Sequence, residues 1–316
     1  MWRHNKNRKE MSRISISVPS SVANVSCGYD VLGFCLGYPC DEMTVEIKQT
    51  QGVEIEHVNG WSIPTDPKLN VCGAVAFEMI KKLNFKYGFK IKIIKGIKPG
   101  SGIGSSAASA AGTAFAINQL TGNKFSKLEL VKFAMYGEEI ASGAKHADNL
   151  SPVIFGGFTL VRSINPLDVV TLPSLNELFV VITHPYIELK TKDARLIINK
   201  EIELEKAVVQ WGNLAGFVAS LYSKNYELLS KTIKDVIIEP QRIKLIPNYK
   251  EIVDRASKYA LGSGISGAGP SIFSICKGKK NAELVLKRIK EITDKKNTTY
   301  SLFLSRINTS GIEIIN

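Results

Sequence analysis

A glycine-rich segment, KPGSGIGSS at residues 98–106, separates two patterns of different kind. Before it, Phe89, Ile91 and Ile93 alternate with lysine residues, which predicts a β-strand with one solvated face. After it, residues 107–120 are rich in alanine and predict an α-helix. The chain therefore passes from a strand, through a glycine loop, directly into the amino-terminal end of a helix.

This arrangement is suited to binding phosphate. Gly100, Gly102 and Gly104 can adopt positive φ angles and let the backbone approach a ligand closely. The first N–H groups of a helix have no partner within it, and the helix dipole gives that end a partial positive charge. Ser105 and Ser106 add hydroxyl groups for a phosphate or a magnesium ion. The predicted phosphate-binding residues are Pro99, Gly100, Ser101, Gly102, Ile103, Gly104, Ser105 and Ser106.

The loop has three alternative interpretations. A Walker A loop requires a lysine directly before the first serine, and none precedes Ser105, so this motif is excluded. The stretch from Gly102 to Ala107 fits the loose pattern of a dinucleotide-binding loop, but no second strand ending in an acidic residue follows about 20 positions on. A glycine turn with a purely structural role stays open on the loop alone.

The composition of the chain narrows the class of protein. No apolar run reaches the roughly 18 residues of a membrane span, and the first ten residues are too polar for a signal peptide, so we expect a cytoplasmic protein without a membrane partner. The five cysteines include no C-x-x-C pair and the four histidines have no H-E-x-x-H spacing, which argues against a disulfide framework and a zinc site. The net charge of +12 would suit a nucleic-acid binder, but it is diffuse, so we expect no nucleic-acid partner.

Strand and helix patterns mix in both halves of the chain, which favours an α+β fold. Residues 13–18 predict a strand that Pro19 ends, and a polar segment follows. Ser126 and Glu129 form a capping box, which predicts a helix over 127–142. Further strands are expected at 43–50, 52–58, 158–163, 178–183, 272–276 and 301–307, and further helices at 70–83, 204–222 and 251–259.

The string PGSGIGSSAAS closely resembles the phosphate loop of the GHMP kinase superfamily, which includes galactokinase, homoserine kinase and mevalonate kinase. VPSSVANVSCGYDVLGFCL at 18–36 and GAKHADNLSPVIFGGFTLVRS at 143–163 are similar to motifs of its homoserine kinase branch. ISGAGPSIF at 265–273 matches the third GHMP motif. The resemblance covers residues 13–316 and implies a left-handed βαβ nucleotide-binding domain followed by a ferredoxin-like domain.

A change of composition near Asn165–Pro173 suggests where these two domains meet. We therefore expect a disordered basic tail over residues 1–12, an ATP-binding domain over 13–168 and a C-terminal domain over 169–316. A second glycine-rich segment at 262–271 is expected to steady the phosphate loop.

The resemblance also implies a reaction and a set of site residues. The expected activity is ATP-dependent phosphorylation of the L-homoserine side-chain hydroxyl, a step toward threonine, by a homodimer. Ser106 and Glu138 would hold Mg²⁺, and Asn70 would lie near the adenine of ATP. The residues expected around homoserine are Asn24, Asp30, His146, Thr191, Arg195 and Arg242.

These residue types suit an amino acid substrate. Arginines bind a carboxylate, and an aspartate binds an ammonium group. The arginines would also suit mevalonate or another small hydroxy acid, so Asp30 is the residue that discriminates. A non-catalytic regulator that binds an amino acid or a nucleotide is a further alternative, which the intact pair of Ser106 and Glu138 disfavours.

Mevalonate-type relatives place an aspartate where this chain has Asn149. An amide cannot act as a general base at neutral pH. We therefore expect direct transfer, in which the hydroxyl proton passes to a phosphate oxygen or to solvent, and the neighbouring Asp148 is the second candidate for proton transfer. The expected catalytic residues are Asn149, Arg195, Ser106 and Glu138.

Overall fold

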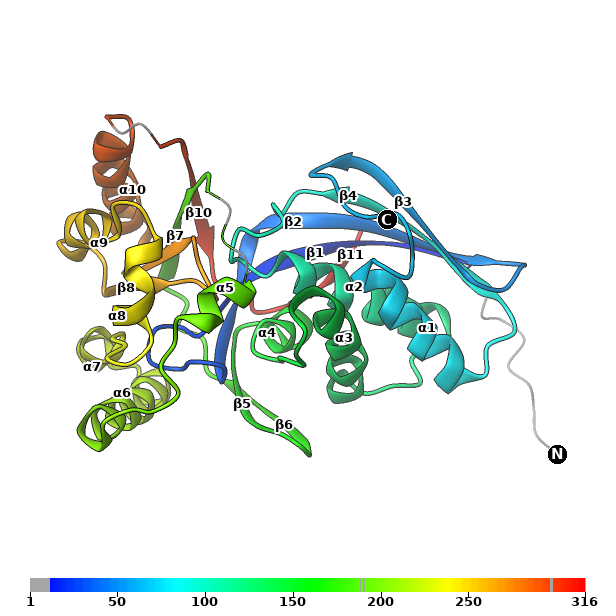
Figure 1. Ribbon diagram of the computed structural model, residues 1–316, viewed down its shortest axis with the longest axis horizontal. Coiled ribbons are helices and arrows are strands. Elements are labelled where there is room, and N and C mark those ends of the chain that lie inside the picture. Colours follow the sequence, from blue (N-terminus) through cyan, green and yellow to red (C-terminus); the bar gives the residue numbers. More distant parts are fainter. Residues whose placement is uncertain (1–11, 188, 190, 296–297, 316) are drawn as a thin grey trace.

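A computed structural model of the protein describes residues 12–187, 189, 191–295 and 298–315, except for the side chains of residues 191 and 192. Most of the expected basic tail lies outside these residues. The described chain forms two β-sheets with helices packed against them (Figure 1). This is the mixed α+β class that the sequence predicts.

The larger sheet has seven strands, with the main order β11-β1-β2-β4-β3 and with the β5–β6 hairpin attached to β2. Its pairings are antiparallel except for β3 and β4, which are parallel and are connected through helix α1. The strands are β1 (Arg13–Ala23), β2 (Leu32–Lys48), β3 (Val53–Gly60), β4 (Gly88–Lys95), β5 (Phe158–Ile164), β6 (Leu167–Leu172) and β11 (Glu313–Ile314).

Helix α2 (Ser105–Leu120) is enclosed between this sheet and three other helices, α1 (Val71–Leu83), α3 (Lys127–Ser142) and α4 (Leu150–Phe155) (Figure 1). Twelve of its sixteen residues are buried, which explains its alanine-rich sequence, because larger side chains would push the neighbours apart. At Gly112 even a Cβ atom would lie 2.6 Å from the sulfur of Met43. This close packing fixes the amino-terminal end of α2, where the glycine loop enters.

The smaller sheet has four antiparallel strands in the order β10-β7-β9-β8. Helices α9 and α10 pack on it through a second apolar cluster that includes Val181, Ile252 and Ile289. The elements of this half are β7 (Leu178–Pro185), α5 (Thr191–Leu196), α6 (Leu204–Ser223), α7 (Tyr226–Thr232), α8 (Glu239–Arg242), the 3₁₀ turn Ile243–Leu245, α9 (Tyr249–Ser257), β8 (Gly262–Ile265), β9 (Ile272–Lys277), α10 (Lys279–Thr293) and β10 (Tyr300–Arg306).

The first strand is longer than predicted. β1 does not end at Pro19 but continues to Ala23, with a shift of register between Pro19 and Ser21. Such a bulge is one of the places in a sheet where proline, which lacks an N–H group, is tolerated. The polar segment expected after it also contains the start of β2 at Leu32.

The strand pairing bears on the expected division of the chain. Residues 167–172 form β6, which pairs with β5, so a boundary after residue 168 falls inside a strand of the larger sheet. Residues 313–314 return to pair with β1 in the same sheet. The division at 168 and 169 stays a prediction, and by sheet membership the crossing lies after Leu172.

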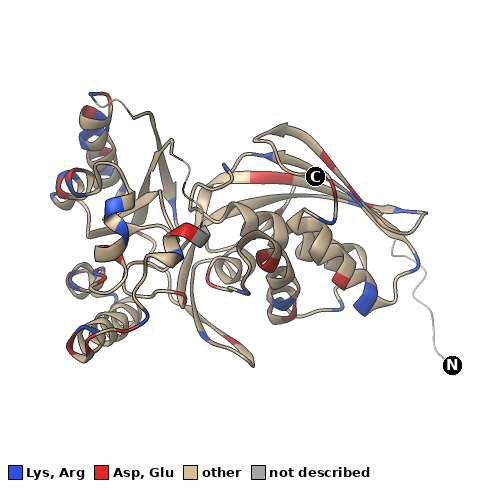
Figure 2. Ribbon diagram, in the orientation of Figure 1, with Lys and Arg blue, Asp and Glu red and all other residues tan. Residues whose placement is uncertain are grey.

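The distribution of charge agrees with the sequence interpretation. Lys and Arg are dispersed over both halves of the described chain and are interspersed with Asp and Glu (Figure 2). All five cysteines are free thiols, and the described residues contain no cluster of three His, Cys, Asp or Glu that could hold a metal ion. None of the described helices has the length and apolar character that a membrane crossing requires.

Candidate active site

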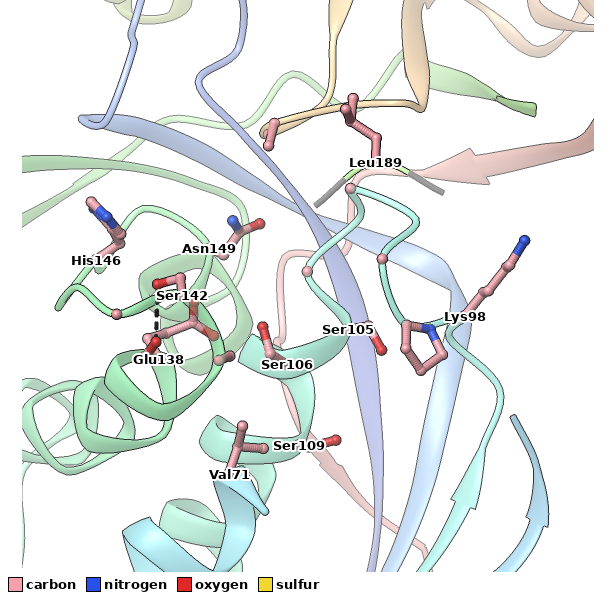
Figure 3. Close-up of a pocket in the computed structure, with 18 of the residues that line it drawn as sticks. Val71, Lys98, Ser105, Ser106, Ser109, Glu138, Ser142, His146, Asn149 and Leu189 are labelled. Carbon is pink, nitrogen blue, oxygen red and sulfur yellow. Dashed lines mark hydrogen bonds between the residues drawn. The ribbon is translucent and has the colours of Figure 1, made fainter. Parts of the chain in front are cut away.

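A pocket of about 1280 Å³ lies where the glycine loop, the start of α1, the end of α3 and loops of the smaller-sheet half meet (Figure 3). It collects residues that are distant in sequence, from Asn24 to Ala268. Of the predicted site residues whose side chains the structure describes, only Ser101 and Ile103 do not line it. Thr191 begins α5, but its side chain lies outside the described set.

The glycine loop has the backbone conformation that the sequence predicts. Gly100, Gly102 and Gly104 have φ angles of 72°, 81° and 70°, in the left-handed region. Gly104 is the N-cap of α2 and supplies no side-chain cap, so the first N–H groups of the helix are left for a ligand. A Cβ atom at Gly104 would lie 2.3 Å from Ser21 Oγ, so this position also requires glycine for space.

Three consecutive carbonyl groups of the loop, at residues 101–103, are anchored from outside it. Ser271 Oγ donates to the first at 2.6 Å, Ser266 Oγ donates to the second at 2.7 Å, and the backbone N–H of Ser21 donates to the third at 3.2 Å. Since the C=O and N–H of a trans peptide point in opposite directions, these bonds turn the next three N–H groups the other way. The segment 262–271 therefore steadies the loop, as expected.

Ser105 and Ser106 have different surroundings. Ser105 Oγ donates to the carbonyl of Ile97 at 2.9 Å, so its hydroxyl proton is already used and its backbone N–H is the group left for phosphate. In Figure 3 the side chain of Ser106 points toward Glu138, and that of Ser105 points away from it. Only Ser106 therefore presents its hydroxyl to the carboxylate.

The Ser106 and Glu138 pair fits a magnesium ion. Burial raises the pKa of the Glu138 carboxyl, and a hydrogen bond with the Ser106 side chain opposes that shift. Glu138 is 7% exposed, and its Oε1 atom is buried without a hydrogen-bond partner among the described residues. An unpaired buried carboxylate oxygen beside a hydroxyl is a donor set of the kind that Mg²⁺ takes.

A buried ion pair, which no sequence pattern predicts, supports the base of the loop. Lys95, which is 2% exposed, pairs with Asp41, which is fully buried. Lys95 Nζ also donates to the carbonyl of Ser105 at 2.8 Å and to Ser109 Oγ at 2.9 Å. In the sequence Lys95 is one of several lysines near the end of a strand, and Asp41 lies 54 positions away, so no local pattern joins them.

The other side of the loop offers an apolar wall. Ile63, Leu69 and Val71 line the pocket there. Asn70 caps α1 by accepting from the backbone N–H of Cys72 at 2.8 Å, and its Nδ2 donates to the carbonyl of Pro64 at 2.5 Å. Its predicted position near the adenine is compatible with this wall, although its amide already serves the helix and the preceding turn.

Aspartate and arginine from distant segments form a fork at the opposite end of the pocket. Arg195 Nη2 lies 2.7 Å from Asp30 Oδ1, and Nη1 lies 3.2 Å from Asp30 Oδ2. Each side chain is about one third exposed, so both charges face the pocket. Tyr29, a residue that the sequence analysis did not single out, accepts from Arg195 at 3.0 Å. Asp30 and Arg195 were predicted to bind the ammonium and the carboxylate of the substrate, and in this structure they form an ion pair with each other.

Arg242 and Asn24 meet at one carbonyl group, that of Gly267. Arg242 Nη1 donates to it at 3.1 Å and Asn24 Nδ2 at 2.6 Å, while Arg242 Nε donates to the carbonyl of Ala194 at 3.0 Å. Asn24 Oδ1 also accepts from the backbone N–H of Asp30 at 3.0 Å. Asn24 therefore helps to hold the loop that carries Asp30, and both its Nδ2 and its Oδ1 atoms are already hydrogen-bonded to the backbone.

The loop that carries Asp30 is strained. Asn24, Val25, Ser26 and Asp30 all have positive φ angles, between 42° and 70°. For Val25, whose side chain is β-branched, this is an unusual conformation that the surrounding structure must hold in place. Strain of this kind is concentrated at functional sites.

His146 and Asp148 lie beside these groups. His146 Nδ1 is 3.9 Å from Asp30 Oδ1, and burial lowers the pKa of His146, so the ring is neutral at physiological pH. Burial, together with the carboxylates of Asp30 and Glu138, raises the pKa of Asp148 to about 7. Asn149 accepts from Ser21 Oγ at 2.9 Å, which fixes its side chain next to the glycine loop.

Comparison with known proteins agrees with this geometry. Residues 70–157 match the N-terminal domain of the GHMP kinases, and residues 217–294 match their C-terminal domain. A homoserine kinase of Chloroherpeton thalassium is 38% identical over 319 residues, which cover 96% of this chain and 100% of the relative. A homoserine kinase of Methanococcus maripaludis is 43% identical over 271 residues, which cover 84% of this chain and 89% of the relative.

Solved structures extend the comparison to three dimensions. The crystal structure of homoserine kinase from Cytophaga hutchinsonii superposes with a TM-score of 0.94 at 40% identity, and the match covers 99% of this chain and 100% of that one. Mevalonate kinase from L. major, in complex with R-mevalonate, superposes with a TM-score of 0.71 at 15% identity and covers 94% and 97%. The second likeness extends to the fold alone.

Proposed function

The chain belongs to the homoserine kinases of the GHMP kinase family, and on that premise we propose that its pocket transfers the γ-phosphoryl group of ATP to the side-chain hydroxyl of L-homoserine. The products are ADP and O-phospho-L-homoserine, on the route to threonine. The observation that carries this proposal is that one pocket holds a phosphate-binding loop at one end and the charges of Asp30, Arg195 and Arg242 at the other. The use of ATP fits the cytoplasmic location expected from the sequence.

Recognition of homoserine follows from its two charges. The ammonium group binds Asp30, and the carboxylate binds Arg195 and Arg242, so the substrate replaces the fork between Asp30 and Arg195 with two new ion pairs. His146, neutral and with its Nε2 atom buried and unpartnered among the described residues, is placed to hydrogen-bond the substrate. A substrate without an ammonium group, such as mevalonate, would leave Asp30 without a new partner.

Phosphoryl transfer depends on positioning and on charge stabilisation more than on base strength. The N–H groups of the loop and of the first turn of α2 hold the phosphates, and the pair Lys95–Asp41 fixes that turn. Ser106 and Glu138 would hold Mg²⁺, which offsets the charge that develops on the transferred phosphoryl group. The ion is therefore part of the proposal, and its ligands come from two different helices.

Transfer without an essential general base is part of the proposal. Asn149 cannot take a proton at neutral pH, and its side chain is directed by Ser21. Asp148 is the alternative base, since a pKa of about 7 is the range in which a general base works best. It is also 4% exposed and accepts from the backbone N–H of Asn149 at 3.1 Å.

Asp148→Asn decides between these two routes. We expect the variant to lose less than about 100-fold in kcat, the lower end of what a general base contributes. If Asp148 were the base, its protonation below pH about 7 would lower kcat in the wild type, and the variant would lose both that pH dependence and most of its activity. Steady-state rates between pH 5.5 and 8.5 for both proteins check this, and a larger loss with that change of profile contradicts direct transfer.

Arg195→Ala tests the proposed function. Removing one partner of a charge pair that becomes buried when the substrate binds costs about 2–5 kcal/mol, so the KM for homoserine should rise by at least about 30-fold while the KM for ATP stays within about threefold. Arg162→Ala is the matched control, because Arg162 forms an ion pair with Asp168 on the exposed β5–β6 hairpin, outside the pocket. An unchanged KM for homoserine in a folded Arg195→Ala protein would show that Arg195 does not bind the substrate carboxylate.

A further inference from the structure

His184 is a buried histidine that takes no part in the reaction proposed above. It lies near the end of β7, is 2% exposed and does not line the pocket. Its Nδ1 atom lies 3.1 Å from Ser271 Oγ, and its Nε2 atom has no hydrogen-bond partner among the described residues. Burying an unpaired ring nitrogen costs free energy that an apolar side chain would not cost. The contact at Nδ1 is therefore the property that distinguishes this histidine from a core residue.

The direction of the hydrogen bonds follows from the groups that make them. Ser271 Oγ lies 2.6 Å from the carbonyl oxygen of Ser101, which can only accept, so the hydroxyl proton points to Ser101. The hydroxyl oxygen then accepts from His184, so Nδ1 carries a proton. Burial and the charge of Lys98 lower the pKa of His184 to about 4, so the ring is neutral and this is its one ring N–H proton. His184 therefore donates to Ser271, and Ser271 donates to Ser101.

This chain of hydrogen bonds ends on the peptide between Ser101 and Gly102, inside the phosphate loop. The C=O and the N–H of a trans peptide point in opposite directions, so fixing the Ser101 carbonyl also fixes the direction of the Gly102 N–H. Gly102 lines the pocket, and a Cβ atom on it would lie 2.5 Å from the carbonyl oxygen of Gly269. The loop is thus held closely against the smaller-sheet half at this point, and the Ser271 hydroxyl sets the orientation of the peptide.

We propose that His184 is a positioning residue for ATP, which acts through Ser271 to orient the Ser101–Gly102 peptide of the phosphate loop. This inference rests on the proposed role of the loop in binding ATP. The Nδ1–H group of His184 occupies the oxygen of the Ser271 hydroxyl from one side, and the hydroxyl proton is thereby directed to the loop. A strand of the smaller sheet in this way controls a backbone N–H group at the phosphate end of the pocket.

His184→Leu tests the proposal, because it keeps a side chain of similar size and removes the Nδ1–H donor. We expect the dissociation constant for ATP to rise about tenfold, roughly the contribution of one hydrogen bond, while the KM for homoserine stays within about twofold. His184→Asn should restore most of the affinity, since its side-chain NH₂ group can donate to Ser271 from the same side. A residue that only fills the core would give the opposite order, with leucine tolerated and asparagine harmful.

Two buried serines of the smaller-sheet half provide the matched comparison. Ser271→Ala should lower the affinity for ATP by about tenfold or more. Ser274, on β9, is 1% exposed, and its hydroxyl is 2.7 Å from that of Ser263, with neither residue lining the pocket. Ser274→Ala should therefore leave the affinity within about twofold. Adding His184→Leu to Ser271→Ala should cause no further loss, because both changes break the same chain of hydrogen bonds.

Calorimetric titration with ATP alone, after thermal melts that establish folding, gives these affinities without reference to the acceptor that the enzyme phosphorylates. Wild-type affinity in folded His184→Leu overturns the proposal, as do additive losses in the double variant. If Gly104→Val also kept its affinity, the loop itself would be at fault rather than the role of His184.

The tautomer of His184 gives a second test that does not depend on the folding of the leucine variant. Nitrogen-15 NMR of the wild-type histidine rings should show His184 protonated at Nδ1, with its signals assigned by their absence from His184→Asn. Ser271→Ala should shift these signals, because the acceptor of the Nδ1 proton is lost. A wild-type His184 protonated at Nε2 instead would reverse the hydrogen bond and contradict the proposal.

Discussion

Glu138→Gln is expected to lower kcat by about 100-fold or more while the KM for ATP changes by less than about fivefold. The carboxylate oxygen of Glu138 that has no partner among the described residues is the proposed ligand for Mg²⁺, and the amide keeps the size of the side chain but removes its charge. The metal stabilises charge that is largest in the transition state, which amounts to several kcal/mol. Each 1.36 kcal/mol corresponds to a factor of ten in rate, so turnover should fall much more than binding.

Glu139→Gln is the control for this substitution. Glu139 is the next residue on α3, but its side chain is 52% exposed and forms a surface ion pair with Lys145 at 3.4 Å. Such pairs contribute at most about 1 kcal/mol, so this variant should behave like the wild type. Initial rates over a range of Mg²⁺ concentrations separate the two proteins. Full activity of Glu138→Gln at limiting Mg²⁺ would show that Glu138 does not bind the ion.

Gly104→Val should abolish measurable ATP binding, with a loss of affinity of at least about 100-fold. The φ angle of 70° is unfavourable for a β-branched residue, and the added Cβ would lie 2.3 Å from Ser21 Oγ and 3.0 Å from Asn149 Oδ1. The loop must therefore move at the point where it enters α2, and the N–H groups that hold the phosphates lose their alignment.

Gly122→Val separates this effect from backbone strain in general. Gly122 also has a positive φ angle, of 89°, but a Cβ there meets nothing within 4 Å, and the residue does not line the pocket. Both variants should lose some stability, but only Gly104→Val should lose its affinity for ATP. Calorimetric titration with ATP, after thermal melts that establish folding, makes the comparison. If folded Gly104→Val bound ATP with an affinity near that of the wild type, the loop would not be the site that binds the phosphates.

Local sequence patterns predicted the parts of the site that neighbouring residues determine. The three glycines of the loop, the helix that follows it and the capping box of Ser126 and Glu129 depend on residues a few positions apart, and the structure has all of them. Motif resemblance supplied the more distant residues, and it identified the family correctly. It named Asp30 and Arg195, yet gave no indication that they contact each other.

Contacts between segments that are distant in sequence could not be predicted from local sequence patterns. Asp41 and Lys95 meet because β2 and β4 are neighbours in the sheet, a pairing that no local pattern encodes. Ser105 was expected to offer its hydroxyl to phosphate, but the carbonyl of Ile97 already accepts from it. Asn24 was expected beside homoserine, and its amide also joins two backbone segments. In each case the partner is fixed by tertiary packing.

The most direct test of homoserine recognition is the ratio of kcat/KM for L-homoserine to that for 4-hydroxybutyrate in the wild-type protein. The two compounds share the carboxylate and the terminal hydroxyl, and 4-hydroxybutyrate lacks only the ammonium group. If Asp30 binds that group, its loss costs about 2 kcal/mol or more, and homoserine should be preferred by at least about 30-fold. Equal use of the two compounds would mean that the pocket has no ammonium site, and the assignment to homoserine would be wrong.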